Sequence, residues 1–362
     1  MINNKMNILV VAGGSGGHIF PALETMNRLS NVKNKLYIID TYFITDERGA
    51  QFVPNTIKKL VILKTITVTL KSVFAYFRNF FKLLYIFYKI RPNILIGFGG
   101  ITTIIPAFVA WIFGVRIFIH EQNATIGKAN RFILKYFNAR CFLSFKNTKG
   151  ISDMRSASYV NFPVRSNIKQ KGAIVDYDTK NEIGILIIAG SQGADFFDNN
   201  IPNIISKVFS ENPNIPSSIR IKIYEQVHIE NHEKVKNIYS KLGIDVEIKT
   251  FFDNIDEYIL KSDLMIARAG ASTIFEILAS KIPSILIPLK NSADNHQYLN
   301  AVEFSKIQTK IQFIEEDAIG NLYDILKEVF TSKKLLIEAQ KELLNFKSNV
   351  NSNIEQNVLK VL

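Results

Sequence analysis

The chain has 362 residues, enough for about two domains, and 47% of them are hydrophobic, so that a large core can form. Its single cysteine, Cys141, excludes an internal disulfide and favours a reducing compartment. No apolar run reaches the roughly 20 residues of a membrane span, and the N-terminal stretch predicts a first strand instead of a signal peptide. The net charge of +12 can serve solubility or attract an anionic partner, and the lack of a nucleic-acid-binding signature disfavours DNA or RNA.

Short apolar runs alternate with amphipathic segments in the first part of the chain. The predicted strands are Met6–Ala12, Tyr42–Thr45, Ile94–Gly97, Ile117–His120 and Arg140–Leu143. The predicted helices are Ile19–Ser30, Val73–Ile90, Thr102–Phe113 and Lys128–Phe137. Strand–helix alternation of this kind predicts a parallel sheet with right-handed crossovers.

The alternation pauses over residues 144–182, which are polar and which we interpret as the region between two domains. It resumes with predicted strands at Ile183–Ala189, Ile219–Tyr224, Asp245–Lys249, Asp263–Ala267 and Ser284–Pro288, and the chain is helical from about Asp317. We therefore predict an α/β protein with two Rossmann-like parallel-sheet domains, at 1–165 and 166–340, facing a cleft. A C-terminal helix within 341–362 is expected to pack back on the first domain.

A glycine-rich turn, "GGSGG" at 13–17, follows the first predicted strand. Glycines allow a tight turn and bring backbone N–H groups and the next helix's N-terminus close to an anion. The dinucleotide fingerprint fails because Ile19 stands at its last glycine position, although Asp40 lies at a suitable distance. His18 begins the helix, where the positive helix end favours a neutral imidazole that can act as a general base. A packed or capping histidine is the alternative.

A second turn of the same kind, "AGSQGADFFDN" at 189–199, offers Ser191 and Gln192 beside backbone N–H groups. Two such turns in one chain favour a diphosphate ligand over a single phosphate. The stretch "IHEQN" at 119–123 places His120, Glu121, Gln122 and Asn123 at a strand end, where they suit hydrogen bonds to hydroxyls; a helix cap is the alternative for Asn123.

The stretch from Ala267 to Ala301 carries the densest set of candidate groups. Ser272 or Thr273 would cap a helix and leave N–H groups for a phosphate, and Glu276, one turn in, could bridge two ribose hydroxyls. A solvated helix charge is the alternative for Glu276, and His296 with Gln297 suits sugar hydroxyls. No metal site or cofactor is expected, so backbone N–H groups, helix ends and Arg165 or Arg268 would balance leaving-group charge.

The segment 68–92 combines large apolar side chains with regularly spaced basic ones. We predict an amphipathic helix that rests on an anionic bilayer, and a core helix with snorkelling lysines is the alternative. The expected membrane face consists of Phe77, Phe80, Phe81, Leu84, Lys71, Arg78, Lys82 and Trp111.

These motifs together resemble the MurG family, the UDP-N-acetylglucosamine transferases that complete the lipid-linked precursor of peptidoglycan. The matching stretches, in the family's order, are "GGSGGHIFPAL" (13–23), "GFGGITTIIPAFVAWIFGV" (97–115), "IHEQNATIGKANR" (119–131), "PVR" (163–165), "GSQGA" (190–194), "RAGAST" (268–273) and "HQYLNA" (296–301). The usual "GNPVR" is "NFPVR" here, with Asn161 and Phe162 replacing Gly and Asn. The departure changes two side chains of this loop and leaves Arg165 in its family position.

The resemblance implies the GT-B glycosyltransferase fold and an inverting transfer without a bound metal. It implies that Phe252 and Ile255 flank the uracil and that Glu276 binds the ribose. The expected donor contacts are completed by Ser15, Gly16, Gly17, Asn123, Arg165, Ser191, Arg268, Ala271, Ser272, Thr273, His296 and Gln297. The acceptor diphosphate is expected at Gly13, Gly14, Ser15, Gly16 and Gly17, with His18 deprotonating the muramyl 4-hydroxyl.

The partners implied are UDP-N-acetylglucosamine, a polyprenyl-diphosphate-linked muramyl peptide and the anionic inner membrane surface. Such an enzyme would be peripheral, on the cytoplasmic face of the cell membrane. Three alternatives stay open: a UDP-sugar epimerase on the same scaffold, a diacylglycerol glycosyltransferase, and a non-catalytic membrane-recruiting subunit. The last would require neither glycine turn and none of His18, Glu276 and Gln297.

Overall fold

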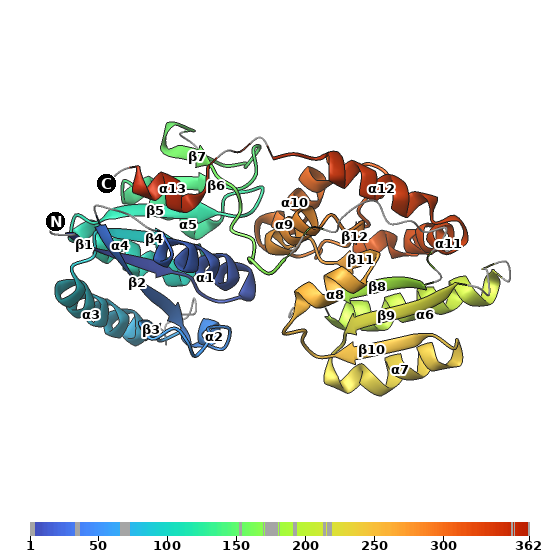
Figure 1. Ribbon diagram of the computed structural model, residues 1–362. Coiled ribbons are helices and arrows are strands. Elements are labelled where there is room, and N and C mark those ends of the chain that lie inside the picture. The colour runs from blue at the N-terminus through green and yellow to red at the C-terminus, as the bar shows by residue number, and fades with distance from the viewer. Residues whose placement is uncertain are drawn as a thin grey trace. The chain divides into compact units, whose positions relative to one another are not determined.

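The computed structural model contains two compact units, each with its own parallel sheet (Figure 1). Unit 1 comprises residues 1–165 and 348–362, and unit 2 comprises residues 166–347. The residues described are 4–32, 37–65, 73–151, 154–168, 170, 180, 182–190, 194–212, 215, 219–348, 350 and 352–360.

Unit 1 is built on a seven-stranded sheet with strand order β3-β2-β1-β4-β5-β6-β7, in which all pairs are parallel. The strands are β1 (Asn4–Val11), β2 (Tyr37–Asp46), β3 (Leu60–Leu63), β4 (Ile94–Gly97), β5 (Arg116–Glu121), β6 (Arg140–Leu143) and β7 (Ala157–Tyr159). The α-helices are α1 (Gly16–Ser30), α2 (Glu47–Ala50), α3 (Val73–Ile90), α4 (Ile104–Ile112), α5 (Lys128–Tyr136) and α13 (Ile354–Leu359).

Both faces of the sheet of unit 1 are covered by helices, which explains the continuous apolar runs of its strands. Alternate residues such as Leu9 and Val11 pack in a core with α3, α4 and α5. Their neighbours Ile8 and Val10 pack in a second core with α1 and α13. The expected return of the C-terminal helix is thus visible in the contact between α13 and α1.

Two strands of unit 1 were not predicted from the sequence, β3 and β7. The interpretation of 144–182 as an interdomain region is wrong for its first part, because β7 pairs with β6 and belongs to the sheet of unit 1. Both strands are short edge strands, and β7 is only partly buried. A three-residue edge strand with one covered face leaves no apolar run to detect.

Unit 2 has a five-stranded parallel sheet of order β10-β9-β8-β11-β12. The strands are β8 (Glu182–Ile188), β9 (Arg220–Gln226), β10 (Asp245–Lys249), β11 (Leu264–Ala267) and β12 (Ser284–Leu286). The α-helices are α6 (Ala194–Glu211), α7 (His232–Lys241), α8 (Ile255–Lys261), α9 (Ala271–Ser280), α10 (His296–Ser305), α11 (Leu322–Ser332) and α12 (Lys334–Asn345). Their apolar faces form one core with the sheet.

Gly184 in β8 allows the close approach of the segment that follows α8. A Cβ at this position would lie 2.5 Å from the Lys261 carbonyl oxygen and 3.0 Å from the Ser262 Cα. The same segment is held by the Asp263 carboxylate, which accepts the Gly184 N–H at 2.8 Å. Backbone atoms cannot move aside as a flexible side chain can, so a side chain at 184 would force the strand and the segment apart.

We predict that Gly184→Ala lowers the free energy of unfolding by about 1–3 kcal/mol, the usual cost of overpacking. Chemical denaturation of the purified protein measures this. Gly320→Ala is the matched control, because a Cβ there meets no atom within 4 Å. Equal stability of the two variants would contradict the close approach.

Candidate functional site

The glycine turn after β1 leads directly into α1. Gly14 has a φ of +85°, a conformation that favours glycine. Ser15 is the N-cap residue of α1, and its side chain makes no capping hydrogen bond. The first N–H groups of a helix have no partner within the helix, so the start of α1 has the features of an anion-binding site.

A buried carboxylate, Asp46 at the end of β2, holds this turn. Its Oδ1 accepts the N–H groups of Gly14 at 3.3 Å and Gly49 at 2.8 Å, and its Oδ2 accepts Arg48 and the Thr102 hydroxyl, each at 3.0 Å. Burial alone would raise the pKa of Asp46, but these hydrogen bonds outweigh burial and hold the pKa below its usual value. Asp46 therefore remains ionised and fixes the turn to the neighbouring strand.

Sequence analysis did not identify Asp46 as a site residue. The available signal was its position: it is the last residue of a strand that pairs in parallel with β1, and parallel strands place their carboxyl ends at one edge of the sheet. Thr102 was equally unpredicted. Its side chain lies so close to Gly13 that a Cβ on Gly13 would sit 2.2 Å from the Thr102 hydroxyl oxygen.

His18 lies in the first turn of α1, and its imidazole is oriented by the backbone. Nδ1 is 3.1 Å from the Gly13 carbonyl oxygen. Because a carbonyl only accepts, this contact assigns the proton to Nδ1 and makes Nε2 the basic nitrogen of the neutral ring. A second glycine turn, after β4, lies against the ring: Gly99 and Gly100 have φ values of +86° and +78°, and a Cβ on Gly99 would be 3.4 Å from Nε2.

The polar cluster after β5 is largely engaged within the chain. The buried Glu121 carboxylate accepts the N–H groups of Asn123 at 3.0 Å and Gly127 at 2.9 Å and the Asn130 side-chain amide at 2.8 Å, and burial raises its pKa. His120 is also fully buried, with Nε2 at 2.7 Å from the Ser144 hydroxyl. The expectation that His120 and Glu121 face ligand hydroxyls is therefore wrong, because both side chains are buried and hydrogen-bonded within the chain.

Burial lowers the pKa of His120 to about 3, and the nearby His18 contributes to the shift. His120 is thus neutral at physiological pH. Its ring packs between Phe98 at 5.2 Å and Phe162 at 5.8 Å between centroids. The Phe162 that departs from the family pattern covers this histidine.

The other departure, Asn161, ties the C-terminal segment to unit 1. Its N–H donates to the Ser352 carbonyl at 2.9 Å, and its side-chain amide donates to the Val350 carbonyl at 3.0 Å. Nearby, the Arg165 guanidinium lies 4.8 Å from the centre of the Phe20 ring in α1. Arg165 is therefore positioned close to the helix that begins at the first glycine turn.

In unit 2, the predicted phosphate turn lies between β11 and α9. Gly270 is the N-cap residue, no side chain caps the helix, and Ser272 and Thr273 in the first turn are half-buried. The Asn300 side chain in α10 donates to the Ala269 carbonyl at 3.1 Å and fixes the turn. The start of α9 thus has the same anion-binding features as the start of α1.

Glu276 lies one turn into α9 and is only 7% exposed. A buried carboxylate is not the solvated helix charge that was the alternative interpretation. Ser191, expected beside the donor phosphates, lies outside the described residues.

Arg268 follows β11 and points into the packing of unit 2. Its Nη1 lies 2.6 Å from Glu316 Oε1 and 3.1 Å from the Ile287 carbonyl oxygen, and its guanidinium lies 4.7 Å from the centre of the Phe197 ring. Burial lowers its pKa. These contacts hold β11 to its surroundings, and they make Arg268 a packing residue in this structure.

Phe252 and Ile255, expected to flank the uracil, are both buried. The Phe252 ring packs against Tyr258, with 4.4 Å between centroids. Their neighbour Phe251 is 47% exposed. The aromatic ring that this segment exposes is thus Phe251, which the sequence analysis did not single out.

His296 and Gln297 begin α10 after a strained turn. Asp294 and Asn295 have φ values of 51° and 53°, which is uncommon for residues other than glycine. His296 Nδ1 lies 2.7 Å from the Ala293 carbonyl oxygen, and Gln297 Oε1 accepts the Leu289 N–H at 3.0 Å. Both side chains are thus oriented by backbone groups of their own turn.

Comparisons with known proteins identify the family of the chain. Residues 8–141 match the glycosyltransferase family 28 N-terminal domain, and residues 184–356 match the family 28 C-terminal domain. Relatives from Rickettsia canadensis and Rickettsia bellii are each 34% identical, over 93% of this chain and 94% of theirs. Each is named UDP-N-acetylglucosamine--N-acetylmuramyl-(pentapeptide) pyrophosphoryl-undecaprenol N-acetylglucosamine transferase. The chain belongs to the MurG family.

Solved structures show that this MurG-family chain has the GT-B fold. The structure of Acinetobacter baumannii MurG matches with a TM-score of 0.72 at 20% identity, covering 99% of this chain and 98% of that one. A UDP-GlcNAc 2-epimerase from Neisseria meningitidis, bound to UDP-GlcNAc, matches with a TM-score of 0.66 at 12% identity, covering 98% and 99%. At these identities the likeness concerns the fold alone, which transferases and epimerases share.

We predict that Asp46→Asn lowers the free energy of unfolding by about 1–3 kcal/mol, because an amide nitrogen cannot accept the hydrogen bonds that one carboxylate oxygen now receives. Transferase activity should fall with it as the glycine turn loosens. Asp40→Asn is the matched control: it changes the same residue type on the same strand, where Asp40 pairs with Lys5 and Lys59 near the surface. A stability loss at Asp46 no larger than at Asp40 would contradict the assigned role.

Proposed function

We propose that this protein transfers N-acetylglucosamine from UDP-N-acetylglucosamine to the 4-hydroxyl of a polyprenyl-diphosphate-linked N-acetylmuramyl-pentapeptide, converting lipid I to lipid II in peptidoglycan synthesis. The observation that carries the proposal is the 34% identity, over 93% of the chain, to relatives named for this transfer. The epimerase neighbours share only the fold and do not favour epimerisation.

We assign the general base to His18. The Gly13 carbonyl holds the Nδ1 proton, so Nε2 can take the proton of the attacking hydroxyl. The hydroxyl oxygen then bonds to the anomeric carbon from the face opposite UDP, which leaves with its electron pair, and the configuration inverts. The acceptor diphosphate would bind at the turn Gly13–Gly17, whose backbone Asp46 fixes by accepting the Gly14 N–H.

We assign the donor to unit 2. The first turn of α9, Ala271 to Thr273, would bind the diphosphate through backbone N–H groups and the helix end, which stabilise the charge of the leaving UDP. Glu276 would accept the ribose hydroxyls, and His296 and Gln297 would contact the N-acetylglucosamine. No metal is needed for this charge stabilisation. Because Arg268 is already paired with Glu316, backbone groups would provide more of the stabilisation of the leaving UDP than the sequence led us to expect.

We also propose that α3 rests on the inner membrane surface, so that the enzyme reaches its lipid-linked acceptor. The support is an exposed aromatic stripe on one helix face, at Phe74, Phe77, Phe81, Tyr85 and Tyr88. The opposite face, with Asn79, Leu83 and Phe87, is buried in unit 1. An apolar stripe at helical spacing beside basic residues is typical of helices that lie on anionic bilayers.

The structure corrects two members of the predicted membrane face. Phe80 and Leu84 are partly buried and pack against the core of unit 1, so they are not part of the exposed stripe. Phe77, Phe81, Arg78, Lys82 and Trp111 are exposed as expected, and Lys71 lies outside the described residues. In the described part of the chain, no helix has the length and apolar character needed to cross a membrane.

We predict that the protein, incubated with UDP-N-acetylglucosamine and a lipid-linked muramyl-peptide analogue, yields a product heavier by one N-acetylhexosamine in mass analysis. His18→Ala should abolish this product and retain donor binding, because the base is lost and the donor site is not. His232→Ala is the control, since His232 contacts only the Val227 carbonyl among its described hydrogen bonds. Near-normal turnover of the His18 variant would remove it as the base.

We predict that Glu276→Ala weakens UDP binding by tenfold or more, since a hydrogen bond to a charged group contributes about 1.5–3 kcal/mol. Isothermal titration with UDP measures the effect. Replacing the exposed Glu233 of α7 by Ala should leave UDP affinity unchanged. An unaltered affinity at position 276 would refute the ribose contact.

We predict that the triple variant Phe77→Ser, Phe81→Ser, Tyr85→Ser no longer sediments with anionic phospholipid vesicles. The same number of exposed apolar residues in unit 2, Ile229, Phe251 and Leu260, changed to Ser, provides the matched control. If both variants bind vesicles equally, α3 is not the membrane face.

A further inference from the structure

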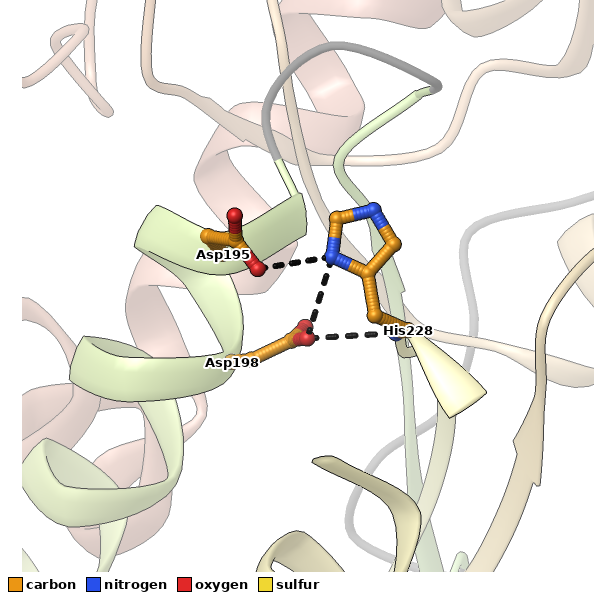
Figure 2. A group of neighbouring side chains, drawn as sticks. All are labelled: Asp195, Asp198 and His228. Carbon is orange, nitrogen blue, oxygen red and sulfur yellow. Dashed lines mark hydrogen bonds and ion pairs between the residues drawn. The ribbon is translucent and has the colours of Figure 1, made fainter. Parts of the chain in front are cut away.

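Three side chains of unit 2, none of them assigned a role above, gather at the start of α6 (Figure 2). Asp195 and Asp198 lie three residues apart on α6, so their side chains share one face of the helix. His228 follows β9 and points toward both of them (Figure 2). One ligand atom from each residue lies within 4.8 Å of the other two.

The contacts within the group are polar and close. His228 Nδ1 lies 2.8 Å from Asp195 Oδ1 and 3.8 Å from Asp198 Oδ2. The Asp198 Oδ2 also accepts the His228 N–H at 3.1 Å and the Asn231 side-chain amide at 2.8 Å. The backbone and Asn231 therefore orient the Asp198 carboxylate toward the imidazole.

Asp198 is fully buried, and its Oδ1 has no hydrogen-bond partner among the described residues. A carboxyl group with an unsatisfied oxygen is costly to bury, and buried carboxylates in proteins are hydrogen-bonded, paired or coordinate metals. Figure 2 shows the carboxyl end of Asp198 directed at the His228 ring. Asp198 is thus a fully buried, incompletely hydrogen-bonded carboxylate whose Oδ2 faces His228, a second observation, beyond the clustering, that points to a cation.

The spacing of the group suits a small transition-metal ion. Zinc binds imidazole nitrogen and carboxylate oxygen at about 2.0–2.1 Å, which in a tetrahedron puts neighbouring ligand atoms about 3.3 Å apart. The observed 2.8 and 3.8 Å lie on either side of that value. The Asp195 and His228 side chains are 80% and 45% exposed, so an ion can enter from solvent and water can complete its coordination.

We propose that Asp195, Asp198 and His228 form a binding site for a first-row divalent transition metal such as Zn²⁺. One imidazole with two carboxylates suits such an ion better than Mg²⁺, which prefers oxygen ligands alone. On binding, the proton that His228 Nδ1 donates to Asp195 leaves to solvent, and the nitrogen lone pair bonds the metal. The ion ties the first turn of α6 to the segment after β9; the proposal does not depend on the transfer reaction.

The test is titration of the metal-free full-length protein with ZnCl₂, followed by calorimetry and by thermal unfolding. We expect saturable binding of about one ion per chain and a higher melting temperature, because an ion that binds only the folded state stabilises it. MgCl₂ should produce neither effect. Absence of zinc binding, or equal responses to both salts, would overturn the proposal.

Variants locate the ion. Asp195→Asn and His228→Gln change exposed side chains and should abolish the response with the fold intact, and Asp198→Asn should do the same. The matched controls are His232→Ala, the neighbouring histidine outside the group, and Asp253→Asn, an exposed aspartate. Zinc binding that survives in the His228 and Asp195 variants, or that is lost in the controls, would place the ion elsewhere and refute the site.

Discussion

The account depends on one physical feature, a helix that begins directly after a parallel strand and directs its positive end toward the carboxyl edge of the sheet. In unit 1 this occurs at the glycine turn before α1, and in unit 2 at the turn before α9. In neither helix does the N-cap side chain make a capping hydrogen bond. The positive end of the helix and the lack of side chains on the glycines make a diphosphate the natural ligand.

The surroundings of each turn keep it in place. Asp46 in unit 1 accepts four hydrogen bonds from three separate segments, and Asn300 in unit 2 reaches the turn from α10. Such groups act on the ligand only through the backbone that they position. They explain why a site built from main-chain atoms can still depend on particular side chains far apart in the sequence.

Much of the fold could be predicted because both sheets are covered on both faces. The predicted strands at Ile94–Gly97, Arg140–Leu143 and Asp245–Lys249 have the same bounds in sequence and structure, as has the helix Val73–Ile90. The edge strand β7 could not be predicted, since its three residues, Ala157–Tyr159, leave little pattern, whereas β3, Leu60–Leu63, is an apolar run that the sequence analysis passed over. The MurG-family resemblance, by contrast, rested on motifs and was confirmed by the relatives.

The site was harder to predict than the fold, for a physical reason. A sequence shows which residues carry polar groups, but not which of those groups the chain itself uses. Glu121 and Arg268 looked available for a ligand, but both are engaged within the chain. Asp46 was overlooked because two of its partners, Gly14 and Thr102, lie 32 and 56 residues away. The group of Asp195, Asp198 and His228 was overlooked because about 30 residues separate the histidine from the aspartates. Likewise, the aromatic helix α3 was identified correctly, but its exposed face became clear only from packing.

The most direct test of the central claim follows backbone amide signals by nuclear magnetic resonance, in protein labelled with ¹⁵N at glycine, alanine, serine and threonine. Addition of UDP should shift the amides of Ala271, Ser272 and Thr273, and addition of a short polyprenyl diphosphate should shift those of Gly13 to Gly17. If saturating concentrations of both ligands leave these amides unchanged and shift others instead, backbone recognition of the two diphosphates at these turns is contradicted.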